Sequence, residues 1–365
     1  MRILSVINVS GFLREQVVCL GHMHRSLGHH VHIIAVGAGC RGEPDCACTT
    51  YQELPPAHLW ALWRHLKACS LDTDSAPDVV QATSPAHLLV ARMLFPSAVR
   101  VYLTPVLSAS GCLVPWLLRS RLAHGVVAWH NRTDQARLPA GVQINVFPPA
   151  VAVFADDAGT KQPTREQLGL SDTQFVIFCP LSTGRRREWR GALWALGILE
   201  FVVPRVALIV TGSEDWQDSV YAFARKARLS SEVVWAPAAK TAAELATASD
   251  LVWSLHDRTS LPLGVWAAAA TGRPVVCHPL TGTALESRAS DIAACVPPWD
   301  APALARTTEA LSRDPDTRQR FGNALQALAR GLYNPLSVAQ RWLDWYERLA
   351  ESVTRRTTTL PASPA

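Results

Sequence analysis

The sequence predicts an α/β fold: two tandem Rossmann-like domains, each a doubly wound parallel sheet, that face each other across a cleft. Three observations predict it. The length of 365 residues suits two ordinary domains. Short apolar runs rich in β-branched residues alternate with helical segments in both halves. A stretch rich in Pro, Ala and Asp interrupts this alternation around residues 147–165. With 48% apolar and 18% charged residues, the chain has ample core and is not a disordered protein.

The first predicted domain comprises residues 1–150. Its strands are continuously apolar, as expected for strands buried on both faces of a parallel sheet. We expect them at 2–9 (RILSVINV), 30–37 (HVHIIAVG), 77–83 (PDVVQAT), 98–104 (AVRVYLT), 124–130 (HGVVAWH) and 144–151 (INVFPPAV). Helices are expected at 15–28, where Val17, Val18, Leu20 and Met23 have helical spacing, and at 84–94 (SPAHLLVARML).

The second predicted domain comprises residues 151–335 and repeats the alternation after the linker. Strands are expected at 174–181, 205–213, 231–236, 251–255 and 273–279, with helices at 187–201, 215–229, 241–250 and 264–272 between them. Residues 336–352 predict an amphipathic C-terminal helix, a candidate for crossing back to the first domain. Residues 353–365 predict a disordered tail.

Composition narrows the classes of function. A formal charge of +5 without a long basic stripe does not predict a nucleic-acid partner. Nine irregularly spaced cysteines, several in apolar runs such as FVIFCPL, predict buried thiols in a reducing, cytoplasmic compartment. No apolar run is long enough for a transmembrane helix. Cys40, Cys46 and Cys48 match no standard zinc spacing, and DTD at 72–74 and DPD at 314–316 read as turns, so we expect no metal.

Ligands of open α/β sheets bind beyond the carboxyl ends of the strands, which directs attention to the residues that follow strands. The segment GRRREWRG at 184–191 gathers four arginines after an apolar strand. A solvated basic helix start would explain them, and so would an anion site for phosphate at a helix N-terminus.

Seven motifs follow one another along residues 1–350. The chain opens with MRILSVI and GHHVHIIAVG, and DVVQATSP, INVFPPAVAVF, GRRREWRG, VALIVTGSED, ELATASDLVWSL and ATGRPVVCHPLTGTALE follow in this order. This order resembles the group-1 (family 4, retaining) glycosyltransferases of the GT-B fold. The opening is similar to the family's first strand and Gly-His-x-Val turn, GRRREWRG matches the family's Gly-Arg-Leu-x-x-x-Lys-Gly in register, and ATGRPVVCHPLTGTALE resembles its Ala-Gly-x-Pro-Val-Val segment.

The resemblance implies a sugar transferase whose co-substrate is a nucleotide-diphosphate sugar, with no cofactor. It implies that Arg185 and Arg190 contact the donor diphosphate and neutralise charge on the leaving group. The remaining donor-side candidates are Gly184, Gly191, Gly212, Ser213, Asp257, Thr259, Thr281, Gly282, Thr283 and Glu286. On the acceptor side, which would take a glycan, a lipid-linked molecule or a small molecule, the candidates are Ser10, Gly11, Thr104 and His130.

The chain departs from the family at its acidic signature, Glu, seven residues, Glu, whose second Glu holds the donor ribose. Counting back from Gly272 places Thr259 and Ala267 at the two positions. Aligning from Ser254 places Asp257 first and leaves Val265 or Ala267 for the second. Neither can accept hydroxyl hydrogen bonds as a carboxylate does.

The acceptor-side half departs as well. Gln81 and Thr83 stand where the family has histidines, Val106 follows Thr104 where the family often has a histidine, and Gly11 stands alone where two glycines are frequent.

Three hypotheses therefore stay open. The chain is a retaining glycosyltransferase, or a non-catalytic GT-B scaffold that binds a nucleotide, a glycan or a partner protein, or another GT-B activity such as an inverting transferase or an epimerase. Residues 105–125, with Arg119 and Arg121, are a candidate for peripheral contact with the inner membrane face, or an ordinary helix packed on the first domain.

Overall fold

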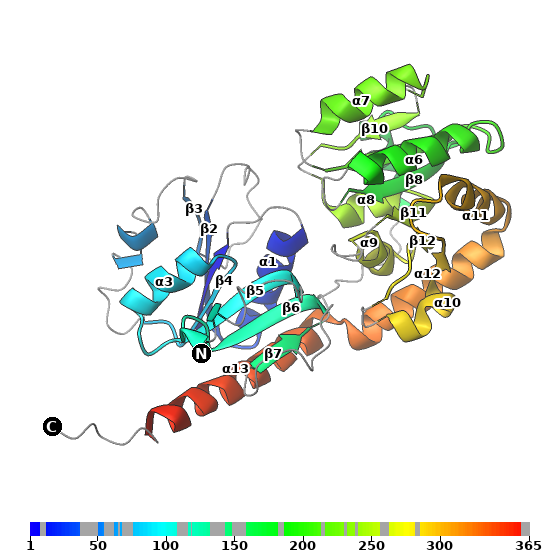
Figure 1. Cartoon of the computed structure of the whole chain (residues 1–365). Helices are drawn as coiled ribbons and strands as arrows, with labels where there is room; N and C mark the ends of the chain where they lie inside the picture. Colours follow the sequence, from blue (N-terminus) through cyan, green and yellow to red (C-terminus); the bar gives the residue numbers. More distant parts are fainter. Residues whose placement is uncertain are drawn as a thin grey trace. The chain divides into compact units, whose positions relative to one another are not determined.

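The structure, a computed structural model, divides the chain into two compact units (Figure 1). Unit 1 combines Met1–Ala150 with Pro335–Ala365, and unit 2 is Val151–Asn334. The structure describes residues 1–7, 12–36, 50–54, 62–64, 66–67, 76–107, 116–117, 119–131, 143–147, 158–181, 186–212, 216–229, 232–237, 240–255, 263–281 and 285–358. Each unit contains one parallel sheet with helices, which confirms the predicted fold class of two doubly wound α/β units.

Unit 1 is built on a seven-stranded sheet in the order β3-β2-β1-β4-β5-β6-β7. The strands are β1 Arg2–Ile7, β2 His30–Val36, β3 Thr50–Leu54, β4 Val79–Ala82, β5 Val99–Leu107, β6 Gly125–Asn131 and β7 Gln143–Val146. All neighbouring strands are parallel, with β1 paired to β2 on one side and to β4 on the other. Helices α1 (Phe12–Ser26) and α3 (Pro85–Leu94) connect strands of this sheet.

Helix α13 (Pro335–Thr358) belongs to unit 1, although it is the last element of the chain. It packs against α1 and β5. Trp342 and Tyr346 are buried in this contact, and the ring of Trp342 stacks on Phe147 with centroids 5.0 Å apart. The helix continues past residue 352, so the first part of the stretch predicted as a disordered tail is helical instead.

Unit 2 is built on a six-stranded parallel sheet in the order β10-β9-β8-β11-β12-β13. The strands are β8 Phe175–Pro180, β9 Val206–Thr211, β10 Val233–Trp235, β11 Leu251–Ser254, β12 Val275–Cys277 and β13 Ala294–Cys295. The helices are α5 Ala158–Gln167, α6 Arg186–Leu199, α7 Gln217–Lys226, α8 Ala242–Ala248, α9 Leu263–Thr271, α10 Ala289–Ile292, α11 Ala301–Arg313 and α12 Pro315–Leu332, with a 3₁₀ turn, η4, at Glu286–Arg288.

Helix α5 corrects the prediction of a linker that reaches residue 165. Its sequence contains Pro163 and few apolar residues, so it has no apolar periodicity that would predict a helix. It is held by charge: Arg165, 2% exposed, donates to Oδ2 of Asp250 at 2.8 Å, and Lys161 donates to Oδ1 of the same carboxylate at 2.9 Å. Tertiary contacts that only the folded unit supplies therefore decide this helix.

The C-terminal part of unit 2 was not predicted as helices. Helix α11 is amphipathic and packs on α6, and its Thr308 hydroxyl accepts a hydrogen bond from the buried indole of Trp253 at 2.9 Å. Asp300 and Asp314 accept hydrogen bonds from the backbone N–H groups of Ala303 and Thr317 and so cap α11 and α12. Asp314 thus begins a helix, where the sequence suggested a turn.

Candidate functional site

The predicted donor-side residues follow the carboxyl ends of four strands that are neighbours in the sheet of unit 2. β9, β8, β11 and β12 lie side by side in this order. β8 leads into α6, β9 into α7, β11 into α9, and β12 into η4. The strand order reverses between β8 and β11, because β8 is the first strand of the unit and the sheet grows outward from it in both directions. Such a switch point is where open α/β sheets bind ligands.

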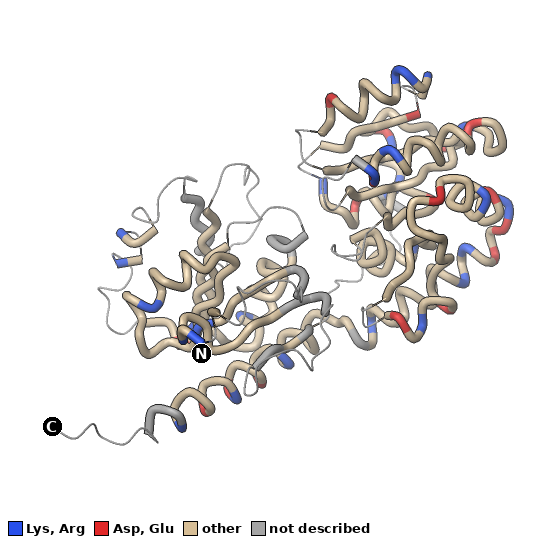
Figure 2. The backbone as a smooth tube through the Cα atoms, viewed as in Figure 1, with Lys and Arg blue, Asp and Glu red and all other residues tan. Residues whose placement is uncertain are grey.

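The start of α6 carries the arginines that follow β8. The helix begins at Arg186, and its first turn presents backbone N–H groups without helical partners. Arg187 and Arg190 are exposed, and Figure 2 shows basic positions at this end of α6. The guanidinium carbon of Arg190 lies 5.4 Å from the ring centroid of Trp189, which is 5% exposed. Arg190 thus makes a cation–π contact with a buried indole ring, and its exposed charge is available to a ligand.

Glu188 is a residue of this segment that the sequence interpretation missed. Its side chain is 1% exposed, although it stands among four arginines. It lies in the first turn of α6, where a carboxylate is stabilised by the helix dipole. A glutamate at the third helical position after a strand would have signalled a helix start from sequence. The segment is therefore less positive than its arginine content suggests.

The two described glycines among the donor-side candidates differ in the space around them. At Gly212, directly after β9, an added Cβ would lie 3.2 Å from the Trp216 ring and 3.4 Å from Cβ of Leu181. At Gly191, in α6, an added Cβ would meet nothing within 4 Å. A side chain at position 212 would thus need the Trp216 ring to shift by a few tenths of an ångström, whereas the space beside Gly191 is open. Gly184, Arg185 and Ser213 lie outside the described residues.

The two positions considered for the second acid of the family signature, which this sequence lacks, both lie in helix α9. Val265 is fully buried and Ala267 is 6% exposed, so both positions considered for a ribose-binding carboxylate lie in the packed body of the helix. Gly264 lets α9 approach β11 closely: an added Cβ would lie 2.7 Å from the carbonyl oxygen of Trp253. Asp257 and Thr259 lie outside the described residues. Among the described residues of α9, no carboxylate is available to the ribose.

The end of β12 adds His278, which the sequence interpretation also missed. This side chain is 3% exposed and accepts a hydrogen bond from the backbone N–H of Trp299, with 3.4 Å between the nitrogens. The two rings meet edge to face with centroids 4.9 Å apart, and Trp299 has a φ of 66°, in the left-handed region. Thr281 and Glu286 follow and are both exposed. Gly282 and Thr283 lie outside the described residues.

The acceptor-side candidates of unit 1 were expected after strands. Thr104 lies inside β5 and is half-buried, and His130 lies inside β6, paired in register with Val106. β5 ends at Leu107, three residues beyond the predicted end at Thr104, and β6 ends at Asn131, one residue beyond the predicted end at His130. Ser10 and Gly11, after β1, lie outside the described residues. β1 and β4 are the strands at which the order of this sheet reverses.

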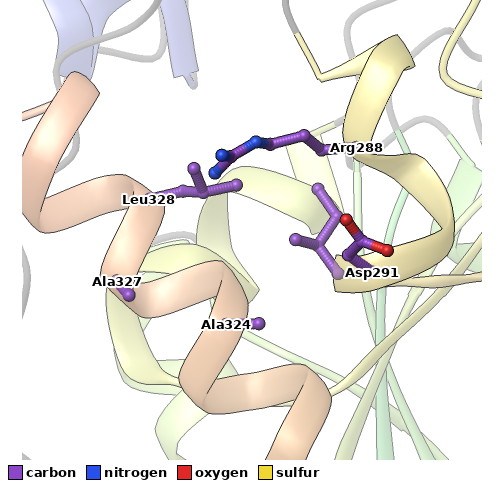
Figure 3. Close-up of a pocket in the computed structure, with 6 residues that line it drawn as sticks. Arg288, Asp291, Ala324, Ala327 and Leu328 are labelled. Atoms are coloured by element: carbon purple, nitrogen blue, oxygen red, sulfur yellow. The ribbon is translucent and has the colours of Figure 1, made fainter.

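Two hollows of unit 2 include none of the predicted residues in their lining. One of about 300 Å³ lies between α10 and α12 and is lined by Arg288, Asp291, Ile292, Ala324, Ala327 and Leu328. In Figure 3 the Arg288 side chain extends toward Leu328. The other, of about 520 Å³, includes Gln174 and Val206 at the amino ends of β8 and β9, which is the edge opposite to the expected ligand position.

Neither metal centres nor membrane spans are found in the described part of the chain. No group of three or more His, Cys, Asp or Glu side chains there could hold a metal ion. No helix there is long and apolar enough to cross a membrane. The cysteines Cys40, Cys46 and Cys48 lie outside the described residues.

Comparison with known proteins gives a match to a family model within unit 2 and matches to the fold along most of the chain. Residues 160–327 match the model of the family described as glycosyl transferases group 1. No curated protein sequence matches the chain.

Solved structures match most of the chain, in both units. A glycosyltransferase from Rickettsia africae has a TM-score of 0.71 at 15% identity, over 95% of this chain and 98% of the other. HepE from Anabaena, in complex with UDP and glucose, has a TM-score of 0.71 at 18% identity, over 95% of this chain and 100% of the other. Sucrose-phosphate synthase from Thermosynechococcus elongatus has a TM-score of 0.67 at 16% identity, over 96% and 100%. These matches establish the fold, which is that of GT-B glycosyltransferases.

Proposed function

We propose that this chain, whose residues 160–327 belong to the group 1 glycosyl transferases, transfers a sugar from a nucleotide-diphosphate sugar to an acceptor hydroxyl with retention at the anomeric carbon. The observation that supports the proposal is the strand order of unit 2: β9, β8, β11 and β12, after which the donor-side candidates stand in the sequence, lie side by side around the switch point. The acceptor would be a glycan, a lipid-linked molecule or a small molecule. A cytoplasmic location and contact with the inner membrane face remain predictions.

The role of the arginines in this proposal is to stabilise the leaving group. In the reaction the bond between the anomeric carbon and the phosphate oxygen breaks, a bond from that carbon to the acceptor oxygen forms, and the acceptor proton leaves. The nucleoside diphosphate departs with extra negative charge. Arg185 and Arg190, with the first N–H groups of α6, would stabilise that charge. A metal ion is not needed for this role, because the guanidinium groups already supply two positive charges.

Nucleotide binding is the first test of the proposal. UDP is a suitable probe, because HepE is similar in fold and was solved with UDP. Titration by calorimetry should give at least a tenfold lower affinity for the double variant Arg185→Ala with Arg190→Ala, as loss of charge-assisted hydrogen bonds predicts. Arg187→Ala is the matched control, since Arg187 is an exposed arginine of the same turn, and it should stay within about twofold. The wild type should bind UDP, and if the double variant binds it with the same affinity, the phosphate assignment is wrong. This outcome does not depend on the base of the natural donor, because the arginines are assigned to the diphosphate.

A second candidate function, a non-catalytic scaffold, is favoured by one observation. The positions of the second acid are the buried Val265 and Ala267, which cannot hold the ribose hydroxyls. An assay of UDP release from a panel of UDP-sugars, with and without sugar acceptors, separates the two. Release of UDP that disappears in the double arginine variant supports the transferase. UDP binding without release from any donor supports the scaffold.

A further inference from the structure

Two cysteines stand directly opposite each other at the edge of the sheet of unit 2. Cys277 ends β12 and Cys295 ends β13, and the parallel register pairs these two residues. Their sulfur atoms are 3.9 Å apart. Cys277 is buried, whereas Cys295, on the edge strand, is exposed. The pair therefore has one thiol that solvent can reach and one that only its neighbour can reach.

The backbone already has the spacing that a disulfide needs. Neighbouring strands lie about 4.8 Å apart, and the two Cα atoms of a disulfide are usually about 4.4–6.8 Å apart. Because Cys277 and Cys295 are partners in the register, their side chains leave the sheet on the same face. Closing the gap from 3.9 Å to a bond of about 2.05 Å requires side-chain rotation rather than movement of a strand.

The two thiols differ in acidity for a reason that the same contact supplies. The pKa of Cys295 is lowered to about 7, because the Cys277 thiol donates a hydrogen bond to its thiolate, and this outweighs the opposing effect of burial. That hydrogen bond and burial raise the pKa of Cys277 well above its usual value. The first proton that the pair loses therefore leaves the exposed sulfur of Cys295. The thiolate is the form of cysteine that attacks peroxides and disulfides.

We propose that Cys295 is a modification site for hydroperoxides and that Cys277 is the thiol that resolves it to an internal disulfide. The Cys295 thiolate attacks one oxygen of hydrogen peroxide, the O–O bond breaks, and a sulfenic acid and a hydroxide form. The sulfur of Cys277 then attacks the sulfur of Cys295, the S–O bond breaks, and the displaced hydroxide takes the Cys277 proton to leave as water. The peroxide gains two electrons and the two thiols lose them.

The site borders the segment that carries Thr281 and Glu286 but shares no residue with it. Cys277 is followed at once by His278, which is held by the contacts with Trp299. A disulfide would join the carboxyl end of β12 to β13 and so restrain the entry to this segment. Its formation does not depend on the function proposed above, since the test needs neither donor nor acceptor.

Tryptic mapping of the whole chain tests the proposal directly. Trypsin does not cleave before Pro274, so Cys277 lies in the peptide 259–288 and Cys295 in the adjoining peptide 289–306, each with no other cysteine. The protein is treated with hydrogen peroxide under native conditions, alkylated at low pH and digested without reductant. We expect the two peptides to be joined, two mass units lighter than their sum, and to separate on reduction. Recovery of both peptides as separate alkylated species would overturn the proposal.

Three variants assign the roles of the two sulfurs. Cys295→Ser should leave Cys277 reduced under the same dose of peroxide, because the buried thiol is not reached. Cys277→Ser should stop at a sulfenic acid on Cys295 that a dimedone probe captures. Cys179→Ser removes another buried thiol of the same unit and should leave the link unchanged. A link between the two peptides that forms equally fast at pH 6 and pH 8 would contradict attack by the Cys295 thiolate, which predicts a rise of about tenfold.

Discussion

Tyr346 in α13 donates a hydrogen bond to Oε1 of Gln81 in β4, with 2.6 Å between the oxygens, across 265 positions of sequence. Both side chains are buried, and Nε2 of Gln81 continues the chain of hydrogen bonds to the hydroxyl of Ser5 in β1. The last helix is thus joined to the two central strands of the unit 1 sheet. Gln81 stands where the family resemblance led us to expect a histidine, and in this chain its side chain serves the fold.

Removal of the Tyr346 hydroxyl should therefore destabilise unit 1. Tyr346→Phe leaves Oε1 of Gln81 buried without this donor, at an expected cost of about 1–3 kcal/mol in the free energy of unfolding. Urea unfolding followed by tryptophan fluorescence measures it. Arg355→Ala in the same helix is the control, because its partner Glu351 and Arg355 itself are 65% and 80% exposed, and it should change stability little. Equal stability of Tyr346→Phe and the wild type would show that the bond contributes nothing.

Asp250 should be essential for the stability of unit 2. Its carboxylate accepts hydrogen bonds from Lys161, Arg165 and the N–H of Val176. Asp250→Asn leaves the buried guanidinium of Arg165 without its anion, at an expected cost of about 3–5 kcal/mol. Glu309→Gln, which breaks a pair with the 69% exposed Arg313, should cost less than about 1 kcal/mol. Chemical denaturation measures the free energy of unfolding of both variants, and comparable decreases in it would contradict this ranking.

The same carboxylate makes stability depend on acidity. Burial alone would raise the pKa of Asp250, but the hydrogen bonds from Val176 and Lys161 and the charges of Lys161 and Arg165 lower it overall. A lowered folded-state pKa contributes stability above the unfolded value near 3.8 and loses it as the pH falls through the folded value. The wild type should therefore lose stability below about pH 4 more steeply than Asp250→Asn.

Titration of His24 should lower the stability of the protein at a less acidic pH than titration of Asp250 does. Its ring is buried under α13 and donates from Nε2 to the carbonyl of Ala339 at 3.2 Å. Burial, opposed by that bond, lowers the pKa of His24 to about 4, whereas the unfolded value is 6.5. The unfolded chain thus takes up the proton first, and between pH 7 and pH 5 this residue should remove about 2 kcal/mol of stability. Urea unfolding of His24→Gln should lack this increment and otherwise follow the wild-type pH profile.

Gly264 and Gly191 should respond to alanine in opposite directions. An alanine Cβ at Gly264 would lie 2.7 Å from the carbonyl oxygen of Trp253, which forces α9 away from β11 and should cost about 1–3 kcal/mol. At Gly191, inside α6, the space is open, and alanine should stabilise the protein by about 0.5–1 kcal/mol. Thermal unfolding of the two variants gives the signs. If Gly191→Ala is stabilised yet binds UDP more weakly, the glycine serves close approach of a ligand.

The sequence predicted those elements whose apolar pattern lies within the segment itself. The apolar strands β1, β2, β8 and β9 and the amphipathic helix α6 were found within a few residues. Helix α5 was missed, because its stability comes from Arg165 and Asp250, which are far apart in sequence. Thr104 and His130 were predicted as the last residues of their strands, but β5 and β6 continue to Leu107 and Asn131, since polar residues can continue a strand when the register of their neighbours supports them.

The strands that precede the candidate residues were predictable, whereas the side-chain environment was not. The alternation of strands and helices predicts that the carboxyl ends of the strands lie at one edge of the sheet, and the roles of the donor-side residues there stay a prediction. The burial of Glu188 and His278 and the pairing of Cys277 with Cys295 depend on three-dimensional packing. Only knowledge of the strand order, which places β13 beside β12, brings those two cysteines together.

The return of α13 to unit 1 has a consequence for biosynthesis. As the chain leaves the ribosome, the first 150 residues emerge long before Trp342 and Tyr346, which complete their core. Unit 2 is continuous from Val151 to Asn334 and can close on itself during translation, ahead of the unit that precedes it. A nascent chain arrested when residues 1–334 have left the ribosome and α13 is still inside it would therefore carry a finished second unit and an open first one. Limited proteolysis of such stalled ribosome complexes would reveal the difference.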